Sequence, residues 1–260
     1  MGILNVTPDS FSDGGRYLDV DDARRQAERM SDDGASIIDI GGESTRPGAK
    51  NVSEAEELER VLPVIKAIRE VTNLPISIDT SKAAVMREAV AAGAAMINDV
   101  LALQEPDALQ AVVDLGVPVC LMHMQGRPRT MQQSPQYDDV TAEVAQFLRD
   151  RADLCIASGI DRRCIVVDPG FGFGKTHSQN IELLGNLRQL RDLGLPVLVG
   201  LSRKSTLGEI TGRDVDERMP GSLSAAVIAV MHGAHIVRAH DVRETVDALD
   251  VARAVMEVNK

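Results

Sequence analysis

A joint that recurs along the chain constrains its fold more than any other feature. At each joint an amphipathic stretch ends on Gly or Asn, and a short apolar run rich in β-branched residues follows. Gly and Asn suit the left-handed conformation that ends a helix, so each joint predicts a helix followed by a strand. The seven joints are Gly34-Ala35, Asn73-Leu74-Pro75, Gly93-Ala94, Gly116-Val117, Gly159-Ile160, Gly194-Leu195 and Gly233-Ala234.

Seven joints predict eight strands. The expected strands are short and apolar on both faces, as in a buried parallel sheet; they cover residues 3–6, 36–40, 76–79, 96–99, 119–122, 165–168, 197–201 and 236–238. Segments with helical periodicity lie between them, such as residues 21–33 and residues 53–71, where Ser53 and Glu56 form a capping box. This alternation predicts an α/β fold, an eight-stranded parallel (βα) TIM barrel, with a doubly wound open sheet as the alternative.

Length and composition support one barrel. The 260 residues match the size of a single α/β barrel, although two smaller domains would also fit. Because no linker or low-complexity run divides the chain, we expect residues 1–260 to form a single domain. Three cysteines without a CxxC spacing indicate neither a disulfide framework nor a structural zinc site.

The charge balance excludes several classes of partner. The chain carries 28 Lys and Arg against 39 Asp and Glu, a net charge of -11, which argues against nucleic acid and anionic membrane surfaces. Only 4 Phe, 2 Tyr and no Trp are available as stacking platforms for single-stranded nucleic acid. No apolar run reaches the ~18 residues of a spanning helix, and no basic region precedes a signal core, so we expect a cytoplasmic protein.

Polar side chains occupy the carboxyl end of each expected strand, where barrels of this kind carry their chemistry. Some of them, Asp99 and Asp241 most easily, could simply cap the helices that follow. The same alternative applies to Asp79 and Asp168. Capping does not account for two cationic clusters in an acidic protein. The strand-end residues are Asn5, Asp39 to Glu43, Asp79, Asn98, Asp99, His123, Asp168, Ser202 to Lys204 and Arg238 to His240.

Motifs at these strand ends resemble those of the dihydropteroate synthase family, whose members are pterin-binding barrels. Its two signature segments match residues 1–15 (MGILNVTPDSFSDGG) and 40–48 (IGGESTRPG). Six further segments follow in the family's order: 78–81 (IDTS), 97–99 (IND), 121–126 (LMHMQG), 168–175 (DPGFGFGK), 200–205 (GLSRKS) and 238–241 (RAHD). Family members usually have a short segment before the first strand that closes the barrel floor, whereas this sequence begins on the strand.

The resemblance implies a transferase of folate biosynthesis. It would join 6-hydroxymethyl-7,8-dihydropterin pyrophosphate to 4-aminobenzoate, releasing pyrophosphate and giving 7,8-dihydropteroate. The family reaction is dissociative, because the aniline nitrogen is a weak nucleophile and the dihydropterin can stabilise a cation at its exocyclic methylene. The resemblance also implies Mg²⁺ as cofactor, a homodimer and a target of sulfonamides.

The pterin is expected to bind at strand-end carboxylates. Its 2-amino-4-oxo edge offers two N–H donors that match one carboxylate, which we assign to Asp168. The resemblance implies that Asp79 and Asn98 meet the remaining ring nitrogens, that Lys204 donates to the 4-oxo or N5 edge, and that the planar Arg238 lies against the pterin face.

The pyrophosphate needs cations and a hard metal ligand. Arg238 and His240 are two residues apart on the expected eighth strand and point the same way, at a position where barrels often bind phosphate. Asn5 resembles the family asparagine at the Mg²⁺ and pyrophosphate site, and its carbonyl oxygen suits that ion. A strand-end hydrogen bond is the alternative role for Asn5.

The 4-aminobenzoate is expected near Ser205, at a helix start where free N–H groups favour an anion. Its other expected neighbours lie in the βα loops, where plain exposure to solvent is the alternative; they are Phe11, Thr45, Arg46, Pro47 and Phe173. Asp13 is expected to stabilise the methylene cation or take up the amine proton, and with Arg46, Lys204 and Arg238 completes the expected catalytic set. We expect the loops of residues 7–17 and 42–50 to close after pyrophosphate binds, so that 4-aminobenzoate follows it.

Two other functions are alternatives, and one motif in the sequence is false. A pterin-binding methyltransferase should lack the STRP loop, and a non-catalytic pterin-binding module should lose Arg46, Arg238 or His240. Gly174-Lys175-Thr176 resembles the end of a P-loop, but Pro169 stands where that motif needs Gly. His123 is expected to pack rather than to bind metal.

Overall fold

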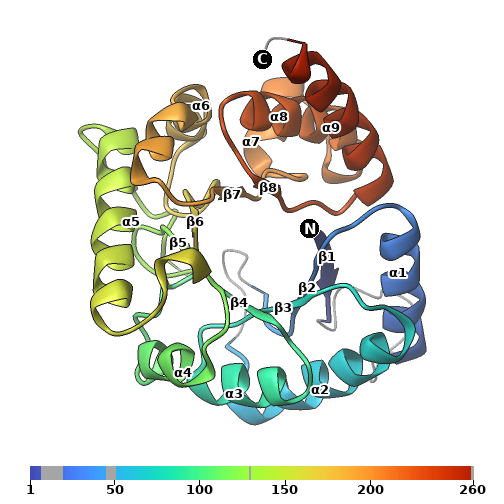
Figure 1. Cartoon of the computed structure of the whole chain (residues 1–260). Coiled ribbons are helices and arrows are strands. Elements are labelled where there is room, and N and C mark those ends of the chain that lie inside the picture. The colour runs from blue at the N-terminus through green and yellow to red at the C-terminus, as the bar shows by residue number, and fades with distance from the viewer. Residues whose placement is uncertain (7–19, 45–50, 129, 259–260) are drawn as a thin grey trace.

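The protein is a ring of parallel strands enclosed by helices (Figure 1). The computed structural model describes residues 1–6, 20–44, 51–128 and 130–258. The strands are β1 (Gly2–Asn5), β2 (Ile38–Gly41), β3 (Ile76–Asp79), β4 (Met96–Asp99), β5 (Val119–Met122), β6 (Ile165–Asp168), β7 (Leu198–Val199) and β8 (Ile236–Val237). Four of them, β3 to β6, have the bounds expected from the apolar runs.

Backbone pairing closes the ring. Strands β1 to β6 form one continuous parallel ladder, and β7 pairs with β8. Isolated bridges join the two sheets, Val167 with Val197 on one side and Gly2 with Ala239 on the other. The Ile3 amide donates to the Ala239 carbonyl at 3.0 Å across the second seam. The eight strands therefore form a TIM barrel, and the open-sheet alternative is wrong.

Helices cover the outside of the ring (Figure 1). They are α1 (Val20–Asp32), α2 (Glu54–Val71), α3 (Ala83–Ala91), α4 (Ala108–Leu115), α5 (Val140–Ala157), α6 (His177–Gly185), α7 (Ser205–Thr211), α8 (Met219–Met231) and α9 (Val242–Glu257). Ser53 caps α2 through the expected capping box with Glu56. Two α-helices, α7 and α8, separate β7 from β8. No helix in the described parts of the chain is long and apolar enough to cross a membrane.

Six of the seven joints have the left-handed conformation that the sequence predicts. The prediction is wrong for Asn73, which has no positive φ, because α2 ends at Thr72 in an extended conformation. Each of the six joint glycines has a positive φ, between 62° at Gly194 and 118° at Gly93. Side chains other than glycine rarely adopt this conformation, so these positions end the preceding helical turn and release the chain into the next strand.

The barrel interior is apolar at one end and charged at the other. Met96, Cys120 and Leu198 pack together inside the ring, with Val166 and Ile236 against them. Most of these residues begin their strands, so they fill the amino-terminal half of the interior. The polar side chains lie at the carboxyl ends of the strands, directly above this apolar layer.

Candidate active site

Arg238 lies at the centre of the charged end of the barrel. It follows β8, and only 20% of its side chain is exposed. Its Nε donates to Asp39 Oδ2 at 2.6 Å, and a terminal nitrogen donates to Asp79 Oδ2 at 2.9 Å. Burial opposes the charge of Arg238, but the two carboxylates raise its pKa above the usual value, so Arg238 remains a cation. Three strands, β2, β3 and β8, thus meet through one guanidinium group.

Asp79 and Asn98 stand side by side at the ends of β3 and β4, in register across the ladder. Asn98 is buried, and its amide nitrogen donates to Asp39 Oδ2 at 3.3 Å. Burial raises the pKa of Asp79 to about 7 against the opposing effect of Arg238. Helix α3 is capped at Lys82 without a side-chain bond, so a capping role for Asp79 is wrong.

Asp168 ends β6 on the other side of the barrel. It is buried, and its Oδ1 accepts a hydrogen bond from the Gly170 amide at 2.7 Å. Burial raises its pKa to about 6, while the Gly170 bond and the ammonium groups of Lys204 and Lys175 lower it. Helix α6 begins later and is capped by Thr176, so Asp168 caps a tight turn rather than a helix.

Lys204 and Phe173 form one wall of the same opening. The Lys204 ammonium lies 4.2 Å from the centre of the Phe173 ring, a cation–π contact. Lys204 is the N-cap of α7 and Ser205 is its first residue, as the sequence predicts.

Asn5 ends β1. Strand β8 ends at Val237, so Arg238 and His240 follow the strand instead of standing on it as the sequence predicts. A Cβ atom added to Gly41 would sit 3.7 Å from Asn5 Oδ1 and 3.8 Å from Asp79 Oδ2, so Gly41 separates these two side chains. His240 Nδ1 is hydrogen-bonded to Ser202 Oγ at 3.0 Å. The site therefore brings together carboxylates, an amide, a guanidinium group and the Lys204 ammonium group above one apolar layer. This combination suits a flat polar heterocycle with an anionic substituent.

Comparison with known proteins identifies the family. Residues 1–240 match the family of pterin binding enzymes. Dihydropteroate synthase of Escherichia coli is 52% identical over 260 residues, which cover all of this chain and 92% of that protein. The chain belongs to the dihydropteroate synthase family. It is therefore a transferase.

Solved structures of the family share its fold closely. The Yersinia pestis dihydropteroate synthase in a sulfonamide drug complex has a TM-score of 0.95 at 52% identity, covering 98% of this chain and 93% of that one. The Xanthomonas albilineans dihydropteroate synthase in complex with 7,8-dihydropteroate has a TM-score of 0.90 at 51% identity, covering 98% and 92%.

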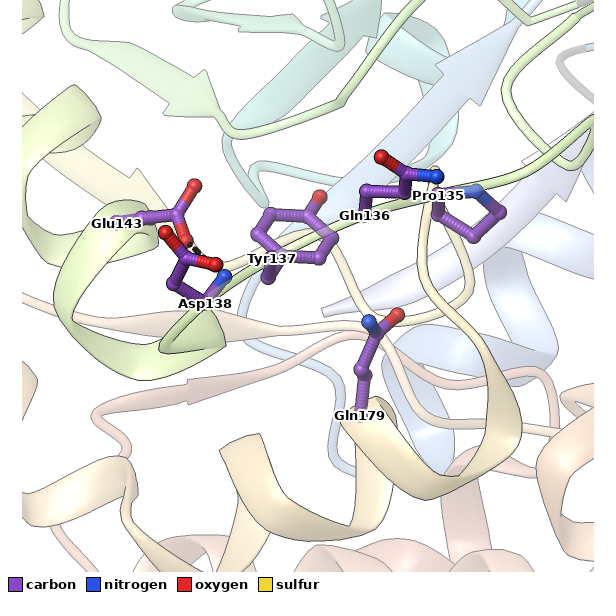
Figure 2. A pocket seen from close by; sticks show the side chains of 6 residues that line it. All are labelled: Pro135, Gln136, Tyr137, Asp138, Glu143 and Gln179. Carbon is purple, nitrogen blue, oxygen red and sulfur yellow. Dashed lines mark hydrogen bonds between the residues drawn. The ribbon is translucent and has the colours of Figure 1, made fainter.

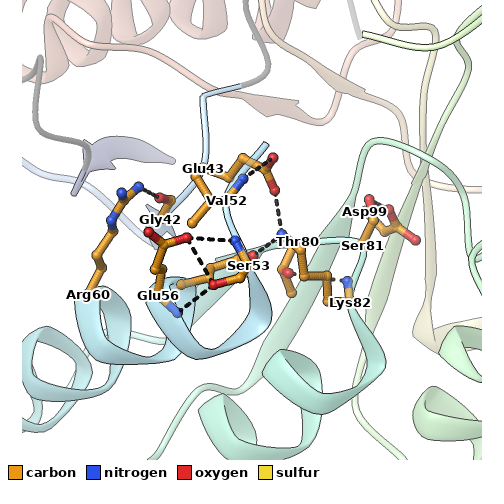
Figure 3. Close-up of polar contacts among 11 residues, drawn as sticks. Gly42, Glu43, Val52, Ser53, Glu56, Arg60, Thr80, Ser81, Lys82 and Asp99 are labelled. Carbon is orange, nitrogen blue, oxygen red and sulfur yellow. Dashed lines mark hydrogen bonds and ion pairs between the residues drawn. The ribbon is translucent and has the colours of Figure 1, made fainter. Parts of the chain in front are cut away.

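Some expected site residues lie outside the described residues; they are Phe11, Asp13, Thr45, Arg46 and Pro47. The described flanks of the second βα loop are held by polar contacts (Figure 3). The Glu43 carboxylate accepts a bond from the Val52 amide at 3.2 Å and pairs with Lys82. Lys82 also pairs with the buried Glu57 at 2.5 Å. This cluster ties the loop flanks to α2 and α3.

Asp99 ends β4 and is hydrogen-bonded to the segments beside it; Figure 3 shows its contact with Ser81. Its carboxylate accepts bonds from the Ser81 hydroxyl and from the amides of Leu101 and Leu103. Burial raises its pKa to about 6. Helix α4 begins at Ala108 with Asp107 as its N-cap, so the helix-capping role expected for Asp99 is wrong; Asp99 orders a turn instead.

Sequence reasoning gave no role to two buried charged residues, Asp39, which it placed only among the polar strand-end residues, and Lys175. Asp39 lies inside the barrel in contact with Arg238 and Asn98. Lys175 is buried, and its ammonium donates to the carbonyls of Gly170 and Phe173 at 2.9 and 3.0 Å and contacts His123 Nδ1 at 2.9 Å. Lys175 thus holds the loop after β6 together through backbone carbonyls.

The side chain of His123 packs, as expected. The centroids of the His123 and Phe147 rings lie 5.0 Å apart in a T-shaped arrangement, and burial together with Lys175 lowers the pKa of His123 to about 3. A separate surface cavity of about 590 Å³ lies beside Tyr137 and Gln179 (Figure 2). None of the expected substrate-binding residues lines it.

Proposed function

We propose that the charged end of this barrel binds 6-hydroxymethyl-7,8-dihydropterin pyrophosphate and 4-aminobenzoate and condenses them to 7,8-dihydropteroate and pyrophosphate. The observation that carries this proposal is one hydrogen-bonded cluster, in which Asn98 and Arg238 donate to Asp39 and Arg238 also donates to Asp79, with Asp168 across the same opening. Sequence identity of 52% to a dihydropteroate synthase supports the same reaction.

In this proposal Asp168 recognises the pterin through hydrogen bonds. Two N–H donors of the 2-amino-4-oxo edge match its carboxylate, with charge-assisted bonds of about 1.5 to 3 kcal/mol each. The Gly170 amide holds one Asp168 oxygen in place, which fixes the carboxylate before the ligand arrives. Asp79 and Asn98 meet the ring nitrogens, and Lys204 meets the 4-oxo or N5 edge.

Arg238 and His240 hold the pyrophosphate as it leaves. Departure builds negative charge on the pyrophosphate and positive charge on the methylene carbon. Arg238 and His240 stabilise the negative charge on the pyrophosphate, and the negative field of Asp79 and Asp168 stabilises the positive charge on the methylene carbon. Little base catalysis is needed, because the amine proton becomes acidic once the new C–N bond has formed.

Asn5 is the residue that would hold Mg²⁺. This ion keeps several waters and typically takes one or two protein oxygens together with substrate phosphates, so a single amide oxygen at the rim fits it. The described residues include no cluster of three or more His, Cys, Asp or Glu that could hold a metal by themselves. When bound with pyrophosphate, Mg²⁺ would supply positive charge to the leaving group.

The carboxylate of 4-aminobenzoate is assigned to Ser205 at the start of α7, with Phe173 beside its ring. Thr45, Arg46, Pro47 and Phe11 complete the wall in this proposal, and Asp13 meets the cation or the amine proton. A sulfonamide would compete at the same position, since it resembles 4-aminobenzoate in shape and charge.

We propose a homodimer that forms through α7, α8 and α9, which lie next to one another (Figure 1). Large exposed apolar side chains gather on these helices and on the turn between α7 and α8; they are Ile210, Val215, Ile228, Met231, Val251 and Val255. Apolar area of this kind on adjacent helices favours association. We place the enzyme in the cytoplasm, where its three unpaired cysteines would stay reduced.

Pyrophosphate release tests the proposed reaction. The protein is mixed with the dihydropterin pyrophosphate, 4-aminobenzoate and Mg²⁺, and release should require both organic substrates. Release without 4-aminobenzoate would indicate a hydrolase instead. Pterin binding with no release under any condition would favour the non-catalytic pterin-binding module.

A further inference from the structure

Asp39 is a buried carboxylate whose side-chain hydrogen bonds in the described structure are all with expected substrate-binding residues, and its charge also acts on the amino terminus of Met1. It lies in the middle of β2, fully buried, with its side chain inside the barrel. Its Oδ2 accepts from Arg238 Nε at 2.6 Å and from Asn98 Nδ2 at 3.3 Å. Its Oδ1 is buried and accepts no hydrogen bond from the described residues.

A buried carboxylate of this kind is not explained by its contribution to folding stability alone. A buried ion pair loses much of its attraction to the desolvation of both charges, and an apolar pair of similar volume is often at least as stable. Met96, Cys120 and Leu198, which pack together inside the same ring, show that its interior accepts apolar side chains. A carboxylate with one oxygen unpartnered therefore points to a role in the adjoining pterin site.

We propose that Asp39 is a positioning residue that sets the hydrogen-bonding direction of Asn98 and the plane of Arg238 for the pterin. This inference rests on the proposed function and extends it to a residue that does not touch the substrate.

The direction of Asn98 follows from the chemistry of Asp39. A carboxylate can only accept hydrogen bonds, so Asn98 must turn its NH₂ group toward Asp39. That leaves Asn98 Oδ1 to accept from a ring N–H of the ligand. Without the Asp39 carboxylate, the Asn98 side chain could turn either its oxygen or its NH₂ group toward the ligand. In the second orientation the NH₂ group would face the ring N–H, and two donors cannot form a hydrogen bond.

The plane of Arg238 is fixed by two carboxylates at once. Asp39 holds Nε, and Asp79 holds a terminal nitrogen. When Asp79 turns to the pterin, Asp39 still pairs with the buried guanidinium. Ligand binding therefore does not leave an unpaired cation in the barrel, which would carry a large desolvation penalty.

The test measures binding of 6-hydroxymethyl-7,8-dihydropterin by calorimetry in Asp39→Asn. We expect at least a tenfold weaker Kd, while the KM for 4-aminobenzoate at saturating pterin changes less than threefold. Ser77→Ala is the matched control. Ser77 pairs with Asp39 across the ladder, is fully buried, and its hydroxyl has no partner among the described residues. The Kd of Ser77→Ala for the pterin should stay within twofold of that of the parent.

An exchange variant separates positioning from general support of the fold. In Asp39→Asn with Asn98→Asp, the new amide can donate to the new carboxylate and still accept from Arg238, and the carboxylate still presents an acceptor to the ligand. This protein should bind the pterin at least threefold more tightly than Asn98→Asp alone, which sets two carboxylates against each other. That comparison stands even if Asp39→Asn does not fold.

Two outcomes would overturn the inference while leaving the proposed function intact. One is a Kd for Asp39→Asn within threefold of the parent, and the other is an exchange variant that binds no more tightly than Asn98→Asp. A parent protein that binds no pterin would overturn the proposed function, and this inference with it.

Discussion

The pKa of Asp168 links pterin binding to pH. Burial raises this pKa to about 6, and only the ionised carboxylate can accept both N–H donors of the pterin. Affinity should therefore rise about tenfold between about pH 5 and about pH 7.5, because one unit below its pKa an acid is only about one-tenth ionised. The Kd from calorimetric titrations across this range checks the prediction.

Folding cannot produce the same trend. A carboxyl group with a raised pKa stabilises the folded state at low pH, and that contribution is lost as pH rises through about 6. Asp168 thus makes the free protein less stable over the range in which binding improves. An affinity that is independent of pH, or that falls with pH, would contradict the role given to Asp168.

At Arg238, lysine should be a poor substitute. Lysine keeps the charge but has neither the plane that faces the pterin nor the fork that reaches Asp39 and Asp79 together. We expect kcat/KM for the pterin substrate to fall at least tenfold in Arg238→Lys. Arg87→Lys is the control, since Arg87 pairs with Asp114 on the outer surface. Parent-like kinetics in Arg238→Lys would show that the guanidinium is peripheral.

Residue chemistry could be predicted from sequence only where a side chain ends a strand. Asp79, Asn98 and Asp168 were assigned in this way, and the structure gathers them at one end of the barrel. Asp39 was placed among the strand-end residues but received no role, because its run looks buried on both faces and the sequence does not say which face meets a charge. Its partner Arg238 is 199 residues away along the chain.

At the scale of elements, two glycines with similar backbone angles should respond differently to alanine. Gly116 (φ 64°) has open space where a Cβ would be, whereas a Cβ on Gly170 (φ 69°) would lie 1.9 Å from the His123 carbonyl oxygen. Gly116→Ala should cost about 1 to 2 kcal/mol of unfolding free energy, the strain of a left-handed residue. Gly170→Ala should cost at least about 3 kcal/mol, since the turn that holds Asp168 must move.

Denaturant unfolding and pterin titration of both variants measure these effects. Gly116→Ala should bind the pterin like the parent, whereas Gly170→Ala should bind it more weakly. Equal losses of stability, or unchanged binding in Gly170→Ala, would show that the turn does not position Asp168.

Most elements could be predicted because their signals are local. The joint glycines, the capping box at Ser53 and the bounds of β3 to β6 depend on short stretches of chain. The ladders of β7 and β8 are only two residues long, shorter than the apolar runs 197–201 and 236–238. An apolar run reports burial, whereas the length of a ladder depends on hydrogen bonds to a neighbouring strand.

At the scale of the whole molecule, the proposed dimer predicts that a charge introduced on the face formed by α7, α8 and α9 weakens association. Ile228 on α8 and Leu154 on α5 are both 43% exposed. Ile228→Glu should shift the mass in solution toward the monomer, because a buried unpaired charge at an interface is strongly unfavourable. Leu154→Glu should leave the mass unchanged. Light scattering after size exclusion measures both, and a dimer that survives Ile228→Glu would place the interface elsewhere.

The whole barrel serves to bring strand ends from distant parts of the chain around one pterin, and Asp168 is the carboxylate on which that account depends. Calorimetric titration of 6-hydroxymethyl-7,8-dihydropterin into the parent and into Asp168→Asn at neutral pH tests it most directly. The amide keeps the shape but sets a donor against a ligand donor, so affinity should fall at least about tenfold, or about 1.4 kcal/mol. The exposed substitution Asp161→Asn should leave it unchanged. Equal affinity in the parent and in Asp168→Asn would contradict the account.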